Sequence, residues 1–123
     1  MASDALAQIL VRKGAYDEAE SEALRSLKIS EQLNGKENVD YISAHVTLAE
    51  VYGSKGEYKL AETTSRAALN SAVEMLGMEH LTTSRAYLIL GQILDTDNRM
   101  DDAEIFFLRA ISCLLYTSPS PRD

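Results

Sequence analysis

The chain has 123 residues, of which 46% are hydrophobic and 25% charged, as expected for one globular domain with a modest core. Its net charge of −7 is spread along the sequence, which argues against a nucleic-acid-binding protein because phosphate contacts need clustered Lys and Arg. No apolar run approaches the roughly 20 residues of a membrane-spanning helix, and no signal peptide is visible. We therefore expect a cytoplasmic protein with no nucleic-acid or membrane partner.

Apolar residues at helical spacing predict a series of helices joined by short polar turns. Met1 falls inside the register of the first helix, which is therefore either short or cut from a longer sequence. Thr82 or Thr83 is expected to cap the fifth helix, and Asn98 to take a left-handed conformation in a tight turn. No stretch alternates as a strand would. The predicted helices span 2–13, 17–33, 39–54, 58–76 and 81–96, and a sixth begins at 101.

One short pattern occurs three times along the chain. Related seven-residue segments occupy 14–20, 56–62 and 98–104, so they recur every 42 residues. A fixed spacing of this length is typical of proteins built from stacked repeats. Small residues also recur in register, and we expect them to let the two helices of each unit approach closely: Ala19, Ala61 and Ala103 should face Ala7, Ala49 and Gly91.

The second unit shows the pattern most completely, with Ala49, Tyr52, Gly56, Tyr58 and Ala61 followed by Ala68-Leu69. This pattern resembles a tetratricopeptide repeat (TPR). The spacing of 42 residues and the loop Leu76-Gly77-x-x-His80 resemble the variant found in kinesin light chains. The resemblance implies an all-α fold, a right-handed superhelical array of three antiparallel helix-turn-helix hairpins. Its units would span about 1–37, 38–79 and 80–112.

The resemblance also implies that the first helix of each unit lines a concave surface for a peptide or partner domain. The alternative is that these helix faces are merely solvated. Family members that grip peptides often have Asn where Ala5, Thr47 and Ile89 stand, so an asparagine clamp is not implied. Apolar spots are expected at three of the implied surface positions, Val11, Val46 and Leu88. The whole implied set is Asp4, Gln8, Val11, Arg12, Ser43, Val46, Glu50, Ser54, Arg85, Leu88, Gln92 and Asp95.

We expect no enzyme activity, no cofactor and no metal site. His45 and His80 lie on different predicted elements, with no Cys or second His at metal-ligand spacing. Partial burial is expected for His45. The acidic residues Asp101, Asp102 and Glu104 are expected to stabilise a helix N-terminus rather than to form a catalytic pair.

The last eleven residues, 113–123, break the repeat register and hold the only Cys and both prolines. They resemble one translated reading frame of a transposon-end adapter used in sequencing libraries, so we expect a non-native tail. If Cys113–Tyr116 continue the sixth helix, Pro119 must end it. A natural Ser/Pro tail is the alternative. If the tail is non-native, the natural protein continues beyond Ser112. One of Phe106 and Phe107 should then face away from its own hairpin, toward a following unit.

These observations favour a non-catalytic protein–protein interaction scaffold that is part of a longer array. The second hypothesis is a regulatory repeat segment of a multidomain enzyme or signalling receptor. The third is a structural element that self-associates through the exposed ends of the array. The full reading frame would discriminate the first two, because a catalytic domain beside the repeats favours the second.

Overall fold

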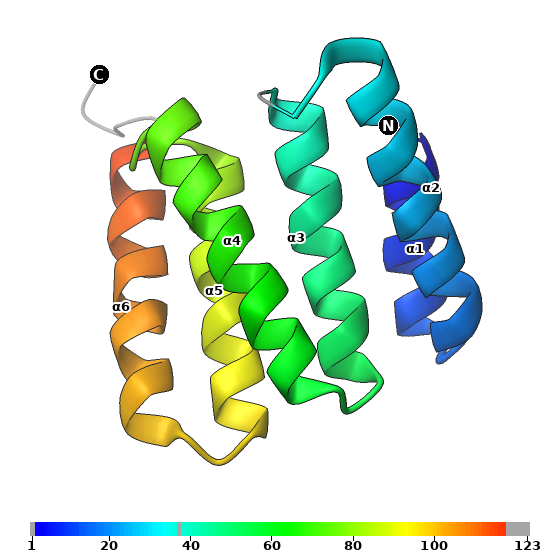
Figure 1. Ribbon diagram of the computed structural model, residues 1–123. Helices are drawn as coiled ribbons and strands as arrows, with labels where there is room; N and C mark the ends of the chain where they lie inside the picture. The colour runs from blue at the N-terminus through cyan, green and yellow to red at the C-terminus, as the bar shows by residue number, and fades with distance from the viewer. Residues whose placement is uncertain (1, 37, 118–123) are drawn as a thin grey trace.

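The computed structural model describes residues 2–36 and 38–117, and the side chains of 5–36 and 38–113. Within these ranges the chain forms six α-helices and no strand, so the predicted all-α hairpin array is confirmed. Figure 1 shows the three antiparallel hairpins side by side. The sequence placed both ends of the first five helices and the start of the sixth to within one residue. The helices are α1 (Ala2–Arg12), α2 (Tyr16–Asn34), α3 (Val39–Ser54), α4 (Tyr58–Leu76), α5 (Leu81–Thr96) and α6 (Met100–Thr117).

The tight turn inside each hairpin closes in the same way. A backbone N–H just after the turn donates to a carbonyl of the last turn of the first helix. Gly56 has φ 85° in the second turn, and Asn98 takes its place in the third with φ 64°, which confirms the expected left-handed asparagine. The three closing bonds join Ala15 to Leu10 (2.9 Å), Glu57 to Tyr52 (3.0 Å) and Arg99 to Leu94 (2.8 Å).

The loops between hairpins end in side-chain caps. Asn38 accepts the backbone N–H of the third residue that follows it, at 3.0 Å. His80 caps α5, because its Nδ1 accepts the N–H of Thr82 at 3.0 Å. The prediction that Thr82 or Thr83 is this cap is therefore wrong. Thr83 is instead buried, and its hydroxyl donates to the carbonyl of Gly77 at 2.7 Å, which ties the loop to the start of α5.

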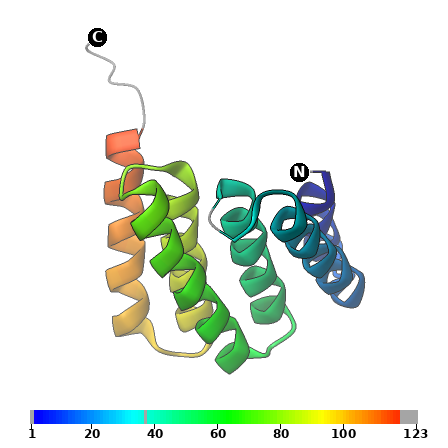
Figure 2. The same ribbon diagram turned by 45° about the horizontal axis from the view of Figure 1, so that its top comes forward.

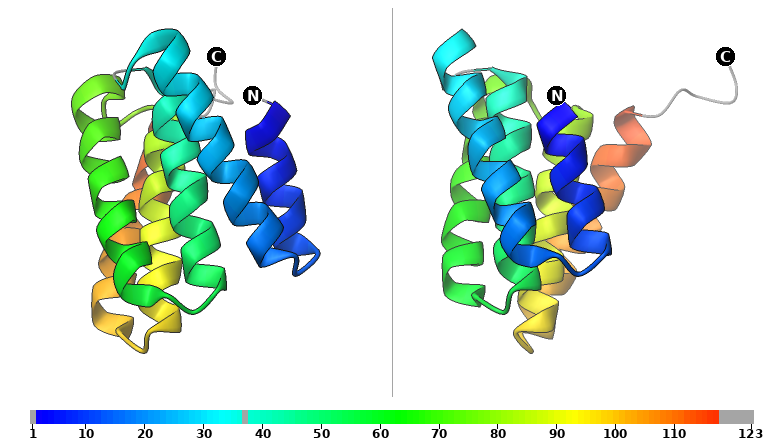
Figure 3. Two further views of the ribbon diagram at one scale, coloured as in Figure 1. Left: turned by 45° about the vertical axis from the view of Figure 1, so that its right-hand side comes forward. Right: turned by 90° about the vertical axis from the view of Figure 1, so that its right-hand side faces the viewer.

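The first helices of the hairpins are neighbours along the array. Helix α3 packs against α1, α2, α4 and α5, whereas in the described part of the chain α2 makes no comparable approach to α4, nor α4 to α6. The first helices α1, α3 and α5 therefore lie on the inner, more closely spaced side, and the second helices spread apart on the outer side. Figures 2 and 3 show the hairpins following one another in chain order.

Most of the core forms two clusters, one for each junction between hairpins, while Ile42, Ala44 and Ala72 are buried outside both. The first-junction cluster is small and rich in alanine: Ala7, Ala19, Ala23, Leu48 and Val51. The second-junction cluster is larger and holds most of the bulky buried side chains. It comprises Val46, Ala49, Ala61, Ala68, Leu69, Ala86, Tyr87, Ile89, Leu90, Ile93, Leu94, Ala103, Ala110 and Cys113. The small residues expected at the helix crossings are all buried, and all except Gly91 belong to these clusters.

Phe106 and Phe107 both pack on the hairpin to which they belong. Phe106 lies parallel to Tyr87 of α5 with 6.3 Å between ring centroids, and the guanidinium of Arg66 lies 5.5 Å from its ring centroid. Phe107 lies against Gly91, also on α5. The expectation that one of the two faces away from its own hairpin is therefore wrong. Adjacent positions on α6 both reach α5 because Gly91 leaves room for the second ring.

The third hairpin exchanges a small residue for a large one across its helix crossing. Phe107 stands where the second hairpin has Ser65, and Gly91 stands where the second hairpin has Ala49. A Cβ atom on Gly91 would lie only 2.8 Å from the ring of Phe107, which is closer than real Cβ contacts. The glycine and the phenylalanine are therefore a matched pair that fills the same space as the alanine and serine of the second hairpin.

Helix α6 continues beyond the end of the repeat register. It runs to Thr117, and Cys113 is 3% exposed within the second-junction cluster. The Cys113 thiol donates to the backbone carbonyl of Met78, and burial followed by the nearby charge of Glu79 raises its pKa. The sixth helix therefore continues through 113–117, beyond the end of the repeat register at Ser112. The non-native origin of the segment stays a prediction, and its remaining residues, 118–123, lie outside the described part.

Candidate functional site

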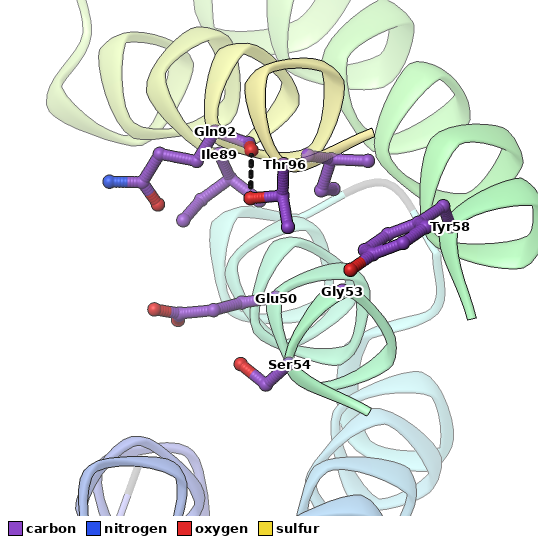
Figure 4. Close-up of a pocket in the computed structure, with 8 residues that line it drawn as sticks. Glu50, Gly53, Ser54, Tyr58, Ile89, Gln92 and Thr96 are labelled. Atoms are coloured by element: carbon purple, nitrogen blue, oxygen red, sulfur yellow. Dashed lines mark hydrogen bonds between the residues drawn. The ribbon is translucent and has the colours of Figure 1, made fainter. Parts of the chain in front are cut away.

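A hollow of about 270 Å³ lies between α3 and α5, the first helices of the second and third hairpins. Figure 4 shows the side chains that surround it. Three of the residues that the resemblance implied for a binding surface, Glu50, Ser54 and Gln92, lie in its wall. The full lining consists of Glu50, Gly53, Ser54, Tyr58, Ile89, Gln92, Ile93 and Thr96.

The floor of the hollow is apolar. Ile89 and Ile93 are each 4% exposed, and they belong to the second-junction cluster. Gly53 sets the spacing of the two helices, because a Cβ atom there would lie 3.1 Å from Cγ1 of Ile93. Tyr58, at the start of α4, lines the side of the hollow opposite the side chains of Glu50 and Gln92. An apolar side chain that entered the hollow would therefore meet hydrocarbon and ring atoms.

The rim of the hollow is polar. In Figure 4 the side chains of Glu50 and Gln92 extend to the same side, away from the helices that carry them. The hydroxyl of Thr96 donates to the backbone carbonyl of Gln92 at 2.8 Å, so it is occupied within α5. The carboxylate of Glu50, the hydroxyl of Ser54 and the amide of Gln92 thus form a rim of acceptors and donors around an apolar floor. This combination is typical of sites that bind peptide segments.

Arg85 fixes the position of Glu50 from the neighbouring helix. Its guanidinium donates to Glu50 Oε1 at 3.2 Å, to Thr47 Oγ1 at 2.8 Å and to the backbone carbonyl of Ser43 at 3.4 Å. The side chains of the ion pair are 25% and 31% exposed, so the pair is partly shielded from solvent. Thr47, which stands at the position of the asparagine clamp, is fully buried and serves this internal bond. The network ties α3 to α5 and holds Glu50 at the rim.

The remaining implied residues fall into three groups. Val46 is 1% exposed and belongs to the core, so the prediction that it offers an apolar spot is wrong. The side chain of Asp4 lies outside the described part of the chain. The others have accessible surface on α1 or α5 but do not line the hollow: Gln8, Val11, Arg12, Leu88 and Asp95.

Sequence reasoning missed several residues of the site, chiefly Gly53, Tyr58 and Thr47. Gly53 carried a signal, since a glycine inside a helix often marks a close approach of another element. Thr96 lies one helical turn after the implied residue Gln92 and follows from the helical period alone. The role of Thr47 depends on the length of the Arg85 side chain on another helix, which no local pattern shows.

Among the described residues, we find no further group of reactive side chains that forms a site. His45 is half-buried, as expected, with its ring centroid 5.8 Å from that of Tyr41. Burial, and after it the positive charge of Lys36, lower the pKa of His45. The described residues contain no group of three His, Cys, Asp or Glu that could hold a metal ion. Among them there is also no helix with the length and apolar character to cross a membrane.

Comparison with known proteins identifies the family. A family model described as tetratricopeptide repeat matches residues 1–72 and again 40–115, which together cover most of the chain. The chain therefore belongs to the tetratricopeptide repeat family, and the predicted membership is confirmed. Repeats of this family generally mediate protein–protein interaction and are typically non-catalytic. No curated protein matches the chain.

Proposed function

We propose that this chain is a non-catalytic scaffold that binds a peptide or partner domain on the surface of its first helices, α1, α3 and α5. The observation that carries the proposal is the hollow between α3 and α5, with its apolar floor and polar rim. An apolar side chain of the partner would insert against Ile89, and the backbone of the partner would hydrogen-bond to Ser54 and Gln92. Since the net charge is −7, we favour a partner segment that is not acidic.

The proposed surface extends from the hollow along the neighbouring helix faces. Arg85 and Glu50 form its centre, because their ion pair positions both groups at the junction of α3 and α5. Leu88 is 39% exposed and supplies an apolar contact on α5. The proposed set, with Val46 removed, is Asp4, Gln8, Val11, Arg12, Ser43, Glu50, Ser54, Arg85, Leu88, Gln92 and Asp95.

Selection from a displayed library of random linear peptides tests the proposal. Peptides that bind the wild-type chain should lose about tenfold or more in affinity for Ser54→Arg, because the long cationic side chain fills the hollow. Lys28→Ala is the matched control, since Lys28 is exposed on α2, away from the hollow. Circular dichroism of both variants checks the fold. Equal binding by wild type and Ser54→Arg, or no selected peptide, would contradict the proposal.

The finer assignments belong to the same proposal. The 42-residue spacing and the His80 cap after Gly77 support a kinesin-light-chain-like subtype, and we place the protein in the cytoplasm. We further propose that the array is part of a longer repeat protein. The alternative is a regulatory TPR segment of a multidomain enzyme or signalling receptor. Reading the source transcript across codon 112 tests both, because it reveals either another 42-residue unit or a catalytic domain.

A further inference from the structure

A second depression, of about 690 Å³, follows the hollow along the same junction between the second and third hairpins. At the end of α5, Asp97 of its wall directly follows Thr96 of the hollow, and at the end of α3, Gly56 of its wall lies two residues after Ser54. Tyr58 lines both depressions, so they lie in succession on either side of this residue. We call the second one the turn groove, because the tight turns of both hairpins contribute to its wall. Its charged wall residues are Glu57, Lys59, Glu62, Asp97 and Arg99.

In the first junction, ion pairs span the place that is equivalent to the turn groove. Lys55 Nζ lies 3.1 Å from Asp17 Oδ1 and 2.6 Å from Glu20 Oε1. Two of these three charges are reversed in the second junction, and the third is kept. The residues that stand 42 positions later in the chain are, in the order Lys55, Asp17 and Glu20, the residues Asp97, Lys59 and Glu62.

The two reversed charges of the second junction do not pair with each other. Among the described side chains, neither Asp97 nor Lys59 takes part in an ion pair. Glu62 has the same sign as Asp97 and binds Arg99 instead, at 2.6 Å. Asp97 is thus a half-buried carboxylate without a cation, at the C-terminal end of α5, where the helix dipole favours a positive charge. A cation supplied from outside the chain would stabilise this carboxylate.

We propose that the peptide segment bound in the hollow continues past Tyr58 into the turn groove and places a Lys or Arg side chain against Asp97. This inference rests on the proposed function, because the hollow sets where the path begins. Among the charged wall residues of the turn groove, carboxylates outnumber cations, which favours a basic segment over an acidic one. The side chain of Tyr58 is as long as about two residues of extended chain, so the basic residue should lie about two to four positions from the apolar residue that fills the hollow.

Selection from the displayed library of random linear peptides tests this inference as well. Peptides selected on the wild type should carry Lys or Arg at one fixed spacing from the apolar residue. Peptides selected on Asp97→Lys should keep the apolar residue and lose the basic one, because the variant replaces an attraction with a repulsion. A peptide selected on the wild type should bind Asp97→Lys about three- to tenfold more weakly, and Asp97→Asn, which keeps the size of the side chain, about two- to fivefold more weakly.

Two controls separate a contact at Asp97 from effects on folding and on net charge. Asp97→Lys should not lower the melting temperature, because the first two hairpins carry Lys at this register position, Lys13 and Lys55. Glu18→Lys makes the same charge change at an exposed residue of α2, outside the hollow and the turn groove, and it should leave peptide affinity unchanged. Equal losses of affinity in Glu18→Lys and Asp97→Lys would overturn the inference.

The selection also distinguishes a failure of this inference from a failure of the proposed function. Peptides that need the hollow, and are therefore rejected by Ser54→Arg, but that carry no basic residue at a fixed spacing would leave the proposed function intact and show that the path through the turn groove is wrong. If the wild type selects no peptide at all, both proposals fail. A basic residue at a fixed spacing that disappears in the selection on Asp97→Lys supports both.

Discussion

The two junctions between hairpins use different physical means to hold equivalent surfaces together. The first junction relies on a small alanine-rich cluster and on Lys55, whose pKa is raised by hydrogen bonds to Glu20 and then Asp17. The second junction combines a larger core with an ion pair from Arg99 to Glu62 at 2.6 Å. Burial alone would raise the pKa of Glu62, but hydrogen bonds from Arg66 and Arg99 outweigh it, so the pKa lies below its ordinary value.

This difference shows that a repeated sequence does not give a uniformly stable array. In a stack where each hairpin contacts only its neighbours, stability is close to a sum of local terms. Among the described residues, the first hairpin has two buried hydroxyls without a hydrogen-bond partner, those of Ser26 and Ser30, whereas the second hairpin has one, that of Ser65. In the second hairpin the same register positions hold Ala68 and Ala72. We therefore infer that the first hairpin opens before the others.

The largest effect on stability is expected at the repeat position that Leu6, Leu48 and Leu90 occupy in the three hairpins. Leu90→Ala should lower the free energy of unfolding by about 2–5 kcal/mol, because Leu90 is fully buried in the second-junction cluster. Leu48→Ala should cost less, since its cluster is smaller. Leu6→Ala should cost less than about 1 kcal/mol, because Leu6 is already 43% exposed. Urea unfolding followed by circular dichroism measures all three. Equal losses for Leu48→Ala and Leu90→Ala would show that the junctions are equally packed.

Substitutions in the matched pair of the third hairpin, Gly91 and Phe107, should change the free energy of unfolding by an intermediate amount. Gly91→Ala should destabilise the wild type, because the added Cβ would meet the ring of Phe107 at 2.8 Å. In a Phe107→Ser background, Gly91→Ala should instead stabilise, since it recreates the alanine and serine of the second hairpin and removes a helical glycine. The coupling between the two positions should be about 1–3 kcal/mol in a double-mutant cycle measured by urea unfolding. Additive effects would show that the two positions do not interact.

The smallest effect concerns the unpaired hydroxyls of the first hairpin. Ser26→Ala should stabilise the protein by about 1 kcal/mol more than Ser21→Ala does, because it removes a buried oxygen that lacks a partner. Ser21 lies on the same helix, α2, but is exposed, so its substitution reports the helix-propensity gain alone. Thermal unfolding gives the difference. Equal gains in the two variants would mean that the Ser26 hydroxyl carries no penalty.

Most of the fold could be predicted from the sequence because repetition supplies three independent views of one pattern. Helix ends followed from glycine, asparagine and the apolar period, and Asn98 could be placed in the left-handed region by its register with Gly56. The N-cap of α5 was missed because a His ring nitrogen caps a helix less often than the hydroxyl of Ser or Thr does. The packing of Phe107 was missed because its compensation stands sixteen positions earlier, at Gly91.

The candidate site was less accessible to sequence reasoning. Of the residues that the resemblance implied, three lie around one hollow: Glu50, Ser54 and Gln92. The implied set also included Val46, which is buried. Val46 stands at the border between the core-facing and solvent-facing sides of α3, and whether such a position is buried depends on how far the next hairpin rotates over it. That rotation is set by contacts such as Gly53 against Ile93, which depend on both helices at once.

The matched pair of Gly91 and Phe107 has a consequence for how such an array can change by recombination. Arrays of repeats gain and lose units when two copies misalign and exchange strands of DNA. A breakpoint in the tight turn near Asn98 would join α3 to α6 and set Ala49 against Phe107, or join α5 to α4 and set Gly91 against Ser65. The first product would be overfilled and the second would contain a void. Breakpoints in the loops between hairpins keep Gly91 together with Phe107 and Ala49 together with Ser65. We therefore expect recombination to preserve whole hairpins as the unit that is gained or lost.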